Sequence, residues 1–398
     1  SDTGNRFFMI QSMLDNDLYK FSMQQAVRML YPKAQARYEF TNRGLTPFPA
    51  RFAKNLKLEL EKMKDLKLSL DQKNFLEKSC RFLTPVYLDY LASYRYDPGE
   101  VMIKQDKDRL ILNIAGPWYR TILWEVPIMA IISEIFFKMT RRKTVTDRER
   151  RAVNLNKARA LAANGVRFAD FGTRRRYSAV NHEGLIRDLL SLENHTLMGT
   201  SNVHFAFLFN IAPIGTFAHE WFMFHAALHG YPMANTSARD AWLNVFQGDL
   251  GIALTDTYTT DVFLSTFDTF HAKLFDGVRH DSGDPFAFAD KIIQHYKRFH
   301  IDPSAKTIVF SDNLDVEKAV KIHQYCNGRV RDVYGIGTSL TNDVGVTPLN
   351  MVIKLNQCRA SLDKPWRNTV KLSDEKGKHT GDPDELKNCL RTFSLPEE

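Results

Sequence analysis

The strongest constraint on the fold is a repeat of short apolar runs, each followed by small or polar residues and then by helical sequence. The repeat starts at Val166, and successive runs begin about 16 to 39 residues apart, the length of one strand-plus-helix unit. Apolar strands that alternate with helices predict a parallel sheet with both faces covered. The runs occupy residues 166–176, 195–202, 211–220, 250–261, 277–285, 307–315 and 333–343.

Seven such units favour an α/β fold built on an irregular (β/α) barrel of about seven strands. The alternative is an open, doubly wound sheet, but no G-x-G-x-x-G pattern follows the first run. In (β/α) barrels, the residues that carry out chemistry lie at the C-terminal ends of the strands. The small and polar clusters occupy these positions, so we expect a functional site at one mouth of the barrel.

The first part of the chain follows a different pattern and is predicted to form an N-terminal α+β domain over residues 1–140. It combines helical segments at residues 16–32 and 51–65 with alternating, strand-like sequence at residues 34–43. Residues 141–350 are assigned to the barrel domain. The apolar stretch that begins at residue 350 is expected to return to the N-terminal domain.

Charge, cysteine content and hydropathy narrow the possible ligands and compartments. The 398 residues carry a formal charge of +8 that is spread along the chain, which favours a small polyanion over a nucleic acid. The four cysteines are scattered and form no C-x-x-C pair, which indicates a reducing, cytoplasmic location. The most apolar stretch, residues 122–139, is interrupted by Glu125, Pro127 and Glu134, so a buried helix is expected there and no membrane association.

Basic residues and Gly-hydroxyl pairs at the ends of the runs predict phosphate binding. Arg174, Arg175 and Arg176 follow the first run, and a guanidinium binds phosphate through paired, charge-assisted hydrogen bonds. We expect one of the three to face the site. The alternative is that one or two of them form structural ion pairs. Gly-Thr pairs in "GTS", "GTF" and "GIGT" offer backbone N–H groups to an anion. The last of them, Gly337-Thr338, falls late in the repeat, where barrels often hold a terminal phosphate.

Acidic residues at other run ends suggest a metal-bound phosphate or a sugar. Asp256, Asp281 and Asp312 could lie near Mg²⁺ or accept hydrogen bonds from sugar hydroxyls. Each could instead cap a turn, and Asp284 before Pro285 is predicted to do so. Together, the clusters predict a site for a small, multiply phosphorylated sugar with Mg²⁺. The sequence contains no P-loop, no G-x-S-x-G elbow and no H-E-x-x-H zinc motif.

Nine stretches, in order along nearly the whole chain, carry a resemblance to a known family. They are "DNDLYKFSMQQ", "WEVPIMAIISE", "DFGTRRR", "GTSN", "GTFAHEW", "LGIALTDTY", "RHDSGDP", "VFSDNLD" and "GIGTSLTND". This set resembles the motifs of the nicotinate phosphoribosyltransferases, which belong to the type II phosphoribosyltransferases. The resemblance implies an N-terminal α/β domain joined to an irregular barrel of about seven strands, in an enzyme that usually works as a dimer.

The resemblance also implies the reaction and its cofactors. Nicotinate and phosphoribosyl pyrophosphate would give nicotinate mononucleotide and pyrophosphate, the entry step of NAD salvage. ATP hydrolysis would be coupled to this transfer through a phosphohistidine, with Mg²⁺ as cofactor, so that the enzyme is classed as a ligase. The family's phosphohistidine lies in the motif matched by "AHEW" and falls on His219. The adjacent Glu220 could orient the ring, hold a cation or cap the following helix.

Further roles carry over onto matching positions. Phe171 and Tyr19 would stack on the two faces of the pyridine ring, with Tyr19 coming from the partner subunit of a homodimer. Arg174 and Arg279 would lie near the pyridine and the phosphates. The resemblance also implies that Arg43 and Lys354 bind pyrophosphate, and that the backbone of Gly337 and Thr338 binds the 5′-phosphate. Asp281 would bind the ribose hydroxyls, and Asp256 and Asp281 would lie near Mg²⁺. Thr200 and Asp312 are expected to make additional contacts with substrate.

Ser201 is predicted to determine the choice between acid and amide. Relatives that use nicotinamide carry an aspartate after Gly-Thr, where this chain has Ser201 in "GTSN". A serine hydroxyl can donate a hydrogen bond to the carboxylate of nicotinate, whereas an aspartate would repel that carboxylate. Ser201 therefore favours the acid, although a polar residue with no such role is also common at a strand end.

Three other functions remain open from the sequence. The first is a sister enzyme that uses nicotinamide or quinolinate. The second is a phosphosugar lyase or isomerase, which would need a general base or a Schiff-base lysine, and Lys354 is the one strand-borne lysine of that kind. The third is a basic nucleic-acid-binding protein, which is not expected, because the sequence lacks the usual interleaving of aromatic and basic residues.

Overall fold

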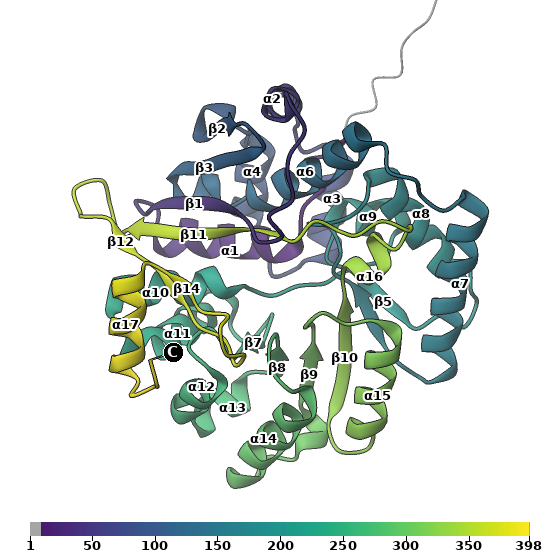
Figure 1. Ribbon diagram of the computed structural model, residues 1–398. Helices are drawn as coiled ribbons and strands as arrows, with labels where there is room; N and C mark the ends of the chain where they lie inside the picture. The colour runs from purple at the N-terminus through teal and green to yellow at the C-terminus, as the bar shows by residue number, and fades with distance from the viewer. Residues whose placement is uncertain (1–8, 398) are drawn as a thin grey trace, which may run out of the picture.

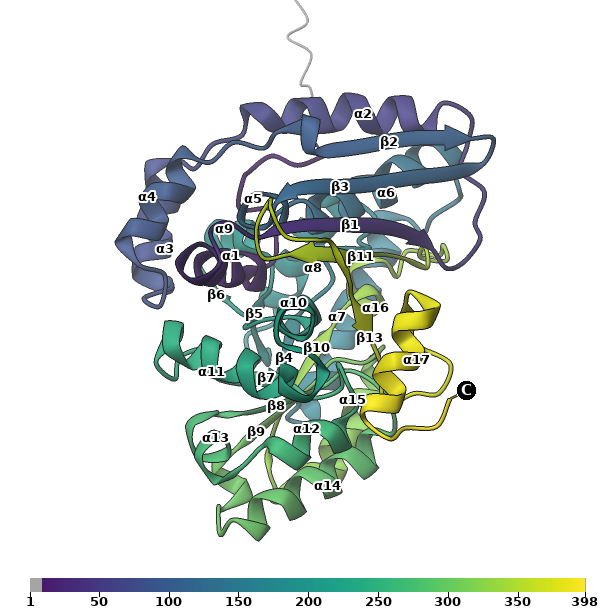
Figure 2. The same cartoon turned by 90° about the vertical axis from the view of Figure 1, so that its left-hand side faces the viewer.

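The structure is a computed structural model that describes residues 9–397. It contains a seven-stranded parallel sheet and a five-stranded antiparallel sheet, which occupy opposite ends of the molecule in Figures 1 and 2. A small two-stranded ladder near the C-terminus is formed by β13 (Val370–Lys371) and β14 (Thr380–Gly381).

The parallel sheet is built from the repeat, with one strand at each predicted run. Its order is β6-β5-β4-β10-β9-β8-β7. The strands are β4 (Phe168–Asp170), β5 (Leu197–Thr200), β6 (Ala212–Pro213), β7 (Ile252–Leu254), β8 (Gly277–His280), β9 (Thr307–Phe310) and β10 (Arg331–Ile336).

The pairing of the last strand with the first curls this sheet. β10 pairs in parallel with β4, and the remaining strands follow in chain order on either side, which leaves β6 and β7 at the two edges. Across this open seam, Thr216 Oγ1 donates to the Ile252 carbonyl at 2.9 Å. The sheet is therefore an incomplete barrel and not a doubly wound sheet, and the predicted α/β barrel class is confirmed.

Helices precede, join and follow the strands of the parallel sheet and cover it. Several of these helices have a Ser, Asn or Asp at the N-cap, whose side chain accepts hydrogen bonds from backbone N–H groups of the first turn and so fixes where the helix starts. The helices of the whole set are α7 (Asp147–Ala163), α8 (Ala179–Leu190), α9 (Val203–Phe209), α10 (His219–His229), α11 (Ala234–Phe246), α12 (Thr260–Thr266), α13 (Thr269–Leu274), α14 (Pro285–Arg298), α15 (Val316–Cys326) and α16 (Thr338–Thr341).

The antiparallel sheet combines N-terminal strands with two strands from the end of the chain. It has the order β12-β11-β1-β3-β2, and β11 pairs along the length of β1, so the chain returns to the N-terminal sheet after residue 350. Buried and exposed residues alternate along β1, as expected for a strand with one face on a core. The strands are β1 (Gln35–Asn42), β2 (Val101–Asp106), β3 (Arg109–Pro117), β11 (Met351–Arg359) and β12 (Arg367–Asn368).

The helices of the N-terminal part include one that is apolar around nearly its whole circumference. Every residue from Val126 to Phe137 in α6 is buried, which confirms the predicted buried helix. Within residues 9–397, no helix has the length and apolar character needed to span a membrane. The helices of this part are α1 (Leu18–Leu30), α2 (Phe52–Lys62), α3 (Leu70–Ser79), α4 (Pro85–Ser93), α5 (Trp118–Thr121) and α6 (Glu125–Thr140), and α17 (Pro383–Thr392) lies near the C-terminus.

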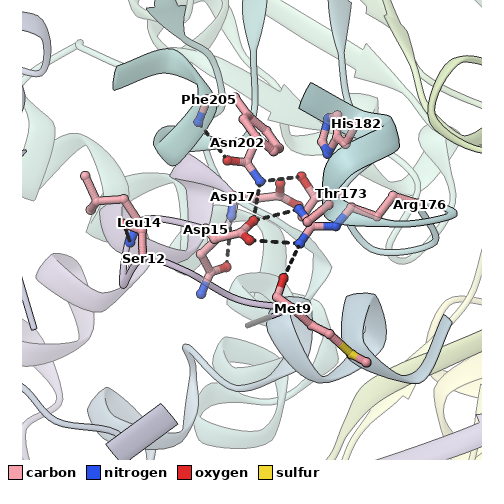
Figure 3. Close-up of polar contacts among 12 residues, drawn as sticks. Met9, Ser12, Leu14, Asp15, Asp17, Thr173, Arg176, His182, Asn202 and Phe205 are labelled. Atoms are coloured by element: carbon pink, nitrogen blue, oxygen red, sulfur yellow. Dashed lines mark hydrogen bonds and ion pairs between the residues drawn. The ribbon is translucent and has the colours of Figure 1, made fainter. Parts of the chain in front are cut away.

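A buried ion pair fastens the N-terminal segment to the barrel (Figure 3). The Arg176 guanidinium donates to both carboxylate oxygens of Asp15, at 2.7 and 2.8 Å, and Asn202 Nδ2 donates to the same carboxylate at 2.8 Å. Asn202 also donates to Thr173 Oγ1 at 3.2 Å. The side chains of Arg176 and Asp15 are 0% and 2% exposed, so water stabilises neither charge and each is stabilised by the other.

Removing one member of this pair is expected to destabilise the fold strongly. In Asp15→Ala the guanidinium of Arg176 would stay buried without a counter-charge, at a cost of about 3–5 kcal/mol in the free energy of unfolding. The matched control is Asp89→Ala, because Asp89 pairs with Lys73 but its side chain is 70% exposed, and such pairs contribute about 0–1 kcal/mol. Urea denaturation measures both, and equal losses would contradict a special role for the buried pair.

Candidate active site

Three side chains from separate strand–helix units meet at the barrel mouth. His219 is the first residue of α10, Asp256 follows β7, and Asp281 follows β8. His219 Nε2 lies 2.8 Å from Asp281 Oδ2 and 3.8 Å from Asp256 Oδ1, and His219 Nδ1 lies 2.9 Å from Thr257 Oγ1. The curl of the sheet thus gathers a histidine and two carboxylates that are far apart in the sequence.

The surroundings set different protonation states for these three groups. Burial, and then the charge of Lys371, lower the pKa of His219 below its ordinary value. Burial opposes the ionisation of Asp281, but the hydrogen bond with His219 and the charge of Arg279 outweigh it and hold the pKa of Asp281 well below its usual range. Burial raises the pKa of Asp256, against the opposing charge of His219. At neutral pH the imidazole is therefore neutral and Asp281 is ionised.

These states fix the tautomer of the imidazole. An ionised carboxylate only accepts hydrogen bonds, so His219 Nε2 carries the proton that is donated to Asp281. His219 Nδ1 then holds the lone pair, which accepts a hydrogen bond from the hydroxyl of Thr257. A neutral imidazole in this state is a nucleophile, held in place at both ring nitrogens.

The two carboxylates fit the predicted magnesium ion. Ligand atoms of His219, Asp256 and Asp281 lie within 4.8 Å of one another. Asp256 Oδ1 is buried and has no hydrogen-bond partner among the described residues, whereas Oδ2 accepts a hydrogen bond from Ser282 at 2.5 Å. Mg²⁺ prefers oxygen ligands, so an unpaired, buried carboxylate oxygen suits it, and the nitrogen of His219 suits it less.

Glycines allow the two predicted ring-stacking residues to approach the mouth. The ring of Phe171 packs so closely on Gly335 that a Cβ at this glycine would lie 2.2 Å from Phe171 Cδ2. A Cβ at Gly215 would lie 3.1 Å from the backbone nitrogen of Tyr19. The glycines of "GIGT" and "GTF" thus serve close packing of backbone and ring, in addition to any contact with an anion.

Tyr19 lies in the site of its own chain. It is the second residue of α1, and the charges of Arg174 and Arg279 act on its hydroxyl. The backbone N–H of Leu18 donates to the Ser201 carbonyl at 2.8 Å, which holds the start of α1 on the end of β5. The start of α1 thus packs on the barrel of the same chain, and the contribution of Tyr19 to the site of a partner subunit stays a prediction.

The three consecutive arginines have three different environments. Arg176 forms the buried ion pair with Asp15, and Arg175 donates to a backbone carbonyl at 3.2 Å. Arg174 is exposed and lies within electrostatic range of Tyr19 and Asp281. Of the three, Arg174 is thus the one whose charge acts on residues of the mouth, and its contact with substrate stays a prediction.

A group of cations lies beside the histidine and the carboxylates. Burial, and then the charges of Lys371 and Arg43, lower the pKa of Lys354 to about 7. Lys354 is in β11 and donates to Thr380 Oγ1 at 3.1 Å, and Lys371 is the last residue of β13. A lysine held partly neutral by burial and by neighbouring cations indicates a place for a polyanion, since an anion would offset the repulsion between the cations.

Sequence reasoning missed Lys371. The segment that contains it shows no strand–helix pattern, and its position depends on a contact with a distant element. The backbone N–H of Leu372 donates to the Thr257 carbonyl at 2.8 Å, which places β13 next to the residues that follow β7. The run of lysines around residues 371–378 was the one available signal.

The remaining predicted residues lie at other strand ends. Arg279 is in β8 and half-buried, and its charge acts on both Asp281 and Tyr19. Asp312 follows β9, and burial raises the pKa of its carboxyl group, with the charge of Asp281 adding to the effect. Gly337 and Thr338 connect β10 to α16.

Thr200 and Ser201 are committed to other protein groups. Thr200 is fully buried and donates to Asp170 Oδ2 at 2.7 Å, and its contact with substrate stays a prediction. Ser201 is 3% exposed and donates its proton to Asp17 Oδ1 at 2.8 Å. The predicted donation from Ser201 to a substrate carboxylate would therefore compete with Asp17, whose pKa is raised by burial. Asp17 is thus a neighbour of the site that the sequence did not reveal.

The structure shows the hydrogen-bond or ion-pair partners of Asp284 and Glu220, two acidic residues for which the sequence allowed more than one role. Asp284 accepts hydrogen bonds from the backbone N–H groups of Phe286 and Ala287, which confirms the predicted helix cap. Glu220 neither caps α10 nor faces His219. Its side chain is 7% exposed and lies 2.5 Å from the ammonium group of Lys20.

The geometry defines a class of protein. A curled parallel sheet carries a neutral histidine and two carboxylates at the C-terminal ends of its strands, with cations and aromatic side chains around them. This arrangement is typical of an α/β-barrel enzyme that acts on an anionic substrate.

Comparisons with known proteins agree along the whole chain. The model of the nicotinate phosphoribosyltransferase (NAPRTase) family matches residues 166–397, and that of the NAPRTase N-terminal domain matches residues 14–133. A nicotinate phosphoribosyltransferase of Desulforapulum autotrophicum is 63% identical over 97% of this chain and 99% of its own length. One from Chromohalobacter salexigens is 50% identical over 97% and 99% of the two chains.

Solved structures show the same fold. The crystal structure of a nicotinate phosphoribosyltransferase from Porphyromonas gingivalis superposes with a TM-score of 0.95 at 41% identity, over 97% of this chain and 100% of that one. A putative nicotinate phosphoribosyltransferase from Saccharomyces cerevisiae gives a TM-score of 0.93 at 32% identity, over 99% and 100%. The chain belongs to the nicotinate phosphoribosyltransferase family, and is accordingly a transferase of NAD biosynthesis.

The low pKa of Lys354 leads to a testable dependence on pH. Its folded-state pKa of about 7 is below the value of about 10.4 expected in the unfolded chain. Between these two pH values the unfolded chain binds one more proton, so this group makes the anion-free protein more stable as the pH rises. A bound anion favours the charged form and should raise the pKa of Lys354.

NMR of ¹³C-dimethylated lysines measures this pKa directly, with Lys354→Arg assigning the signal. We expect a titration near pH 7 without anions, and a shift to higher pH in the presence of sulfate, which does not itself titrate in this range. The variant Lys371→Met should also raise the pKa, because it removes a neighbouring charge. Titration near pH 10 in the anion-free protein would contradict the proposed crowding of cations.

Proposed function

We propose that this chain converts nicotinate and phosphoribosyl pyrophosphate to nicotinate mononucleotide and pyrophosphate, and that it couples this transfer to ATP hydrolysis through a phosphohistidine at His219. The observation that carries the proposal is the site itself, in which a neutral His219 and the carboxylates of Asp256 and Asp281 lie beside repelling cations. Phosphoribosyl pyrophosphate, pyrophosphate and ATP are all polyanions that such cations would bind.

The transfer step requires positioning and charge stabilisation, and no general base. The pyridine nitrogen of nicotinate is already nucleophilic, and the bond from ribose C1 to pyrophosphate loosens before that nitrogen arrives, in an oxocarbenium-like transition state. Phe171 and Tyr19 would hold the ring, and Arg43 and Lys354 would stabilise the departing pyrophosphate. Asp281 would hold the ribose hydroxyls until the new bond has formed.

The coupling to ATP uses the lone pair of His219. In the tautomer set by Asp281, Nδ1 is the nucleophilic nitrogen, and it would accept the γ-phosphoryl group while ADP leaves. The phosphate would bring about −1.5 to −2 charges to the mouth. Arg174 and Lys371 are the nearby cations able to respond, and their reorganisation would tighten binding of the phosphoribosyl donor.

Magnesium would be held by Asp256 and Asp281, with the phosphates of the substrate completing its ligands. When bound, Mg²⁺ neutralises charge on the departing pyrophosphate. The 5′-phosphate would rest on the backbone of Gly337 and Thr338, with Asp312 on the ribose side.

Other functions fit the site less well. A pKa of about 7 is suitable for a Schiff-base lysine, but Lys354 owes this value to burial and neighbouring cations, which is what a pyrophosphate subsite requires. Quinolinate would need further cations for its second carboxylate.

The homodimer stays a prediction, and it need not supply Tyr19.

The phosphohistidine is tested by His219→Asn. The variant should keep a slow, ATP-independent transfer but incorporate no acid-labile label from γ-labelled ATP. We expect kcat/KM for phosphoribosyl pyrophosphate in the presence of ATP to fall by about tenfold or more, or about 1.4 kcal/mol. The matched control is His229→Asn, an exposed histidine at the other end of α10. Undiminished ATP stimulation in His219→Asn would exclude the phosphohistidine.

The choice of acid over amide is tested by Ser201→Asp. This change would put a second carboxylate beside Asp17, close to the proposed position of the nicotinate carboxylate, and charge repulsion should lower the ratio of kcat/KM for nicotinate over nicotinamide by about tenfold or more. Ser201→Ala removes the hydroxyl without adding charge and should change the ratio far less. A ratio that stays the same in Ser201→Asp would remove Ser201 from the specificity argument.

A further inference from the structure

A buried polar junction joins the helix that carries Tyr19 to the helix that carries His219. Lys20 Nζ lies 2.5 Å from Glu220 Oε1 and 2.7 Å from Glu125 Oε2. The side chains of Lys20, Glu220 and Glu125 are 1%, 7% and 13% exposed. Three charged groups from α1, α10 and α6 therefore meet away from bulk water.

Both carboxylate oxygens of Glu220 are in use. Glu220 Oε2 accepts a hydrogen bond from the hydroxyl of Tyr38 at 2.6 Å and lies 3.4 Å from Trp118 Nε1, which also donates to the Tyr38 hydroxyl at 3.0 Å. Because Tyr38 is in β1 and Trp118 is in α5, the junction connects the antiparallel sheet with the barrel. Burial opposes the charge of Lys20, but Glu125 and Glu220 outweigh it and raise the pKa of Lys20, so the ammonium stays protonated.

Lys20 and Glu220 are each next to a proposed site residue in the sequence. Lys20 follows Tyr19 in α1, and Glu220 follows His219 in α10, so each member of the ion pair is the direct neighbour of a proposed site residue. A second contact acts in parallel, in which Ser22 Oγ donates to the Thr216 carbonyl at 2.5 Å. The approach of α1 to residues 215–220 is thus set by an ion pair, a hydrogen bond and the missing side chain of Gly215.

Stability alone does not account for a buried ion pair. Desolvation of the charges consumes most of the attraction between them, and apolar residues of similar size often stabilise a core equally well. A charged pair differs from an apolar contact in its direction and length, because a small displacement leaves a buried charge without a partner. Such a pair suits a place where two elements must keep one relative position.

We propose that Lys20 and Glu220 are positioning residues that hold the ring of Tyr19 in register with His219. Through this contact the nicotinate site on α1 and the phosphate-accepting site on α10 keep a fixed separation, although neither Lys20 nor Glu220 touches substrate. The inference rests on the proposed function, in which Tyr19 binds the pyridine ring and His219 accepts a phosphoryl group.

The test uses two single variants and their combination. Glu220→Gln keeps the shape of the side chain but loses the charge and exchanges one of the two acceptor oxygens for an amide donor. Lys20→Met removes the ammonium. We expect each to raise KM for nicotinate by about tenfold and to weaken ATP stimulation in parallel, while the ATP-independent kcat changes little. The double variant should be no worse than the more severe single variant, because both changes break the same contact.

The control is Arg120→Met, which breaks the partly buried pair of Arg120 and Glu100 in the N-terminal part. It should lower Tm without changing KM for nicotinate or ATP stimulation, which separates loss of stability from loss of register. Nicotinate KM and ATP stimulation equal to wild type in folded Glu220→Gln would overturn the proposal, as would strictly additive effects in the double variant. If Lys20→Met does not fold, Glu220→Gln decides alone.

Failure of the proposed function would look different. If wild-type protein itself shows no ATP stimulation, the coupling to His219 is wrong, and the effect of Glu220→Gln on KM for nicotinate still tests the register of Tyr19. If wild type behaves as proposed and both variants match it, the positioning role alone is wrong.

Discussion

The parallel pairing of β10 with β4 is the contact on which the site depends. It joins the last strand of the repeat to the first, and so turns a row of seven strands into a curled sheet whose C-terminal ends face a common centre. Without that curl, His219, Asp256 and Asp281 would project from separate points along a flat edge. With it, the three lie within hydrogen-bonding or metal-ligand distances of one another. The seam between β6 and β7 stays open, and α1 approaches the mouth beside it at Gly215.

The charges at the mouth differ from those buried elsewhere in the fold. The buried charge of Arg176 is matched by Asp15, and that of Lys20 by two glutamates. Lys354 is different, because burial, and then the charges of Lys371 and Arg43, lower its pKa to about 7. Repulsion of this kind is unfavourable in the free protein and is relieved when a polyanion binds. On the proposed function, the polyanion is a phosphate group of the substrate, and the free state gives up some stability for its binding.

Local sequence patterns predicted the architecture because buried strands and capped helices leave a local signal. The seven apolar runs each contain a strand, and Asp284 caps α14 as its position before Pro285 indicated. What the sequence could not supply are contacts between distant elements. The partner of Ser201 is Asp17, the partner of Glu220 is Lys20, and Lys371 reaches the site through a short ladder with no periodic pattern. These contacts depend on how α1 and the C-terminal segment pack against the barrel, and no spacing along the chain encodes that packing.

The central claim is that this mouth transfers a phosphoribosyl group to nicotinate. The most direct measurement incubates the purified protein with phosphoribosyl pyrophosphate, ATP and Mg²⁺, and offers nicotinate, nicotinamide and quinolinate in parallel, with products identified by mass. Nicotinate mononucleotide formed at a kcat/KM well above that of either competing reaction is the predicted result. Product from nicotinamide or quinolinate in preference to nicotinate, or none from any of the three, would contradict the claim.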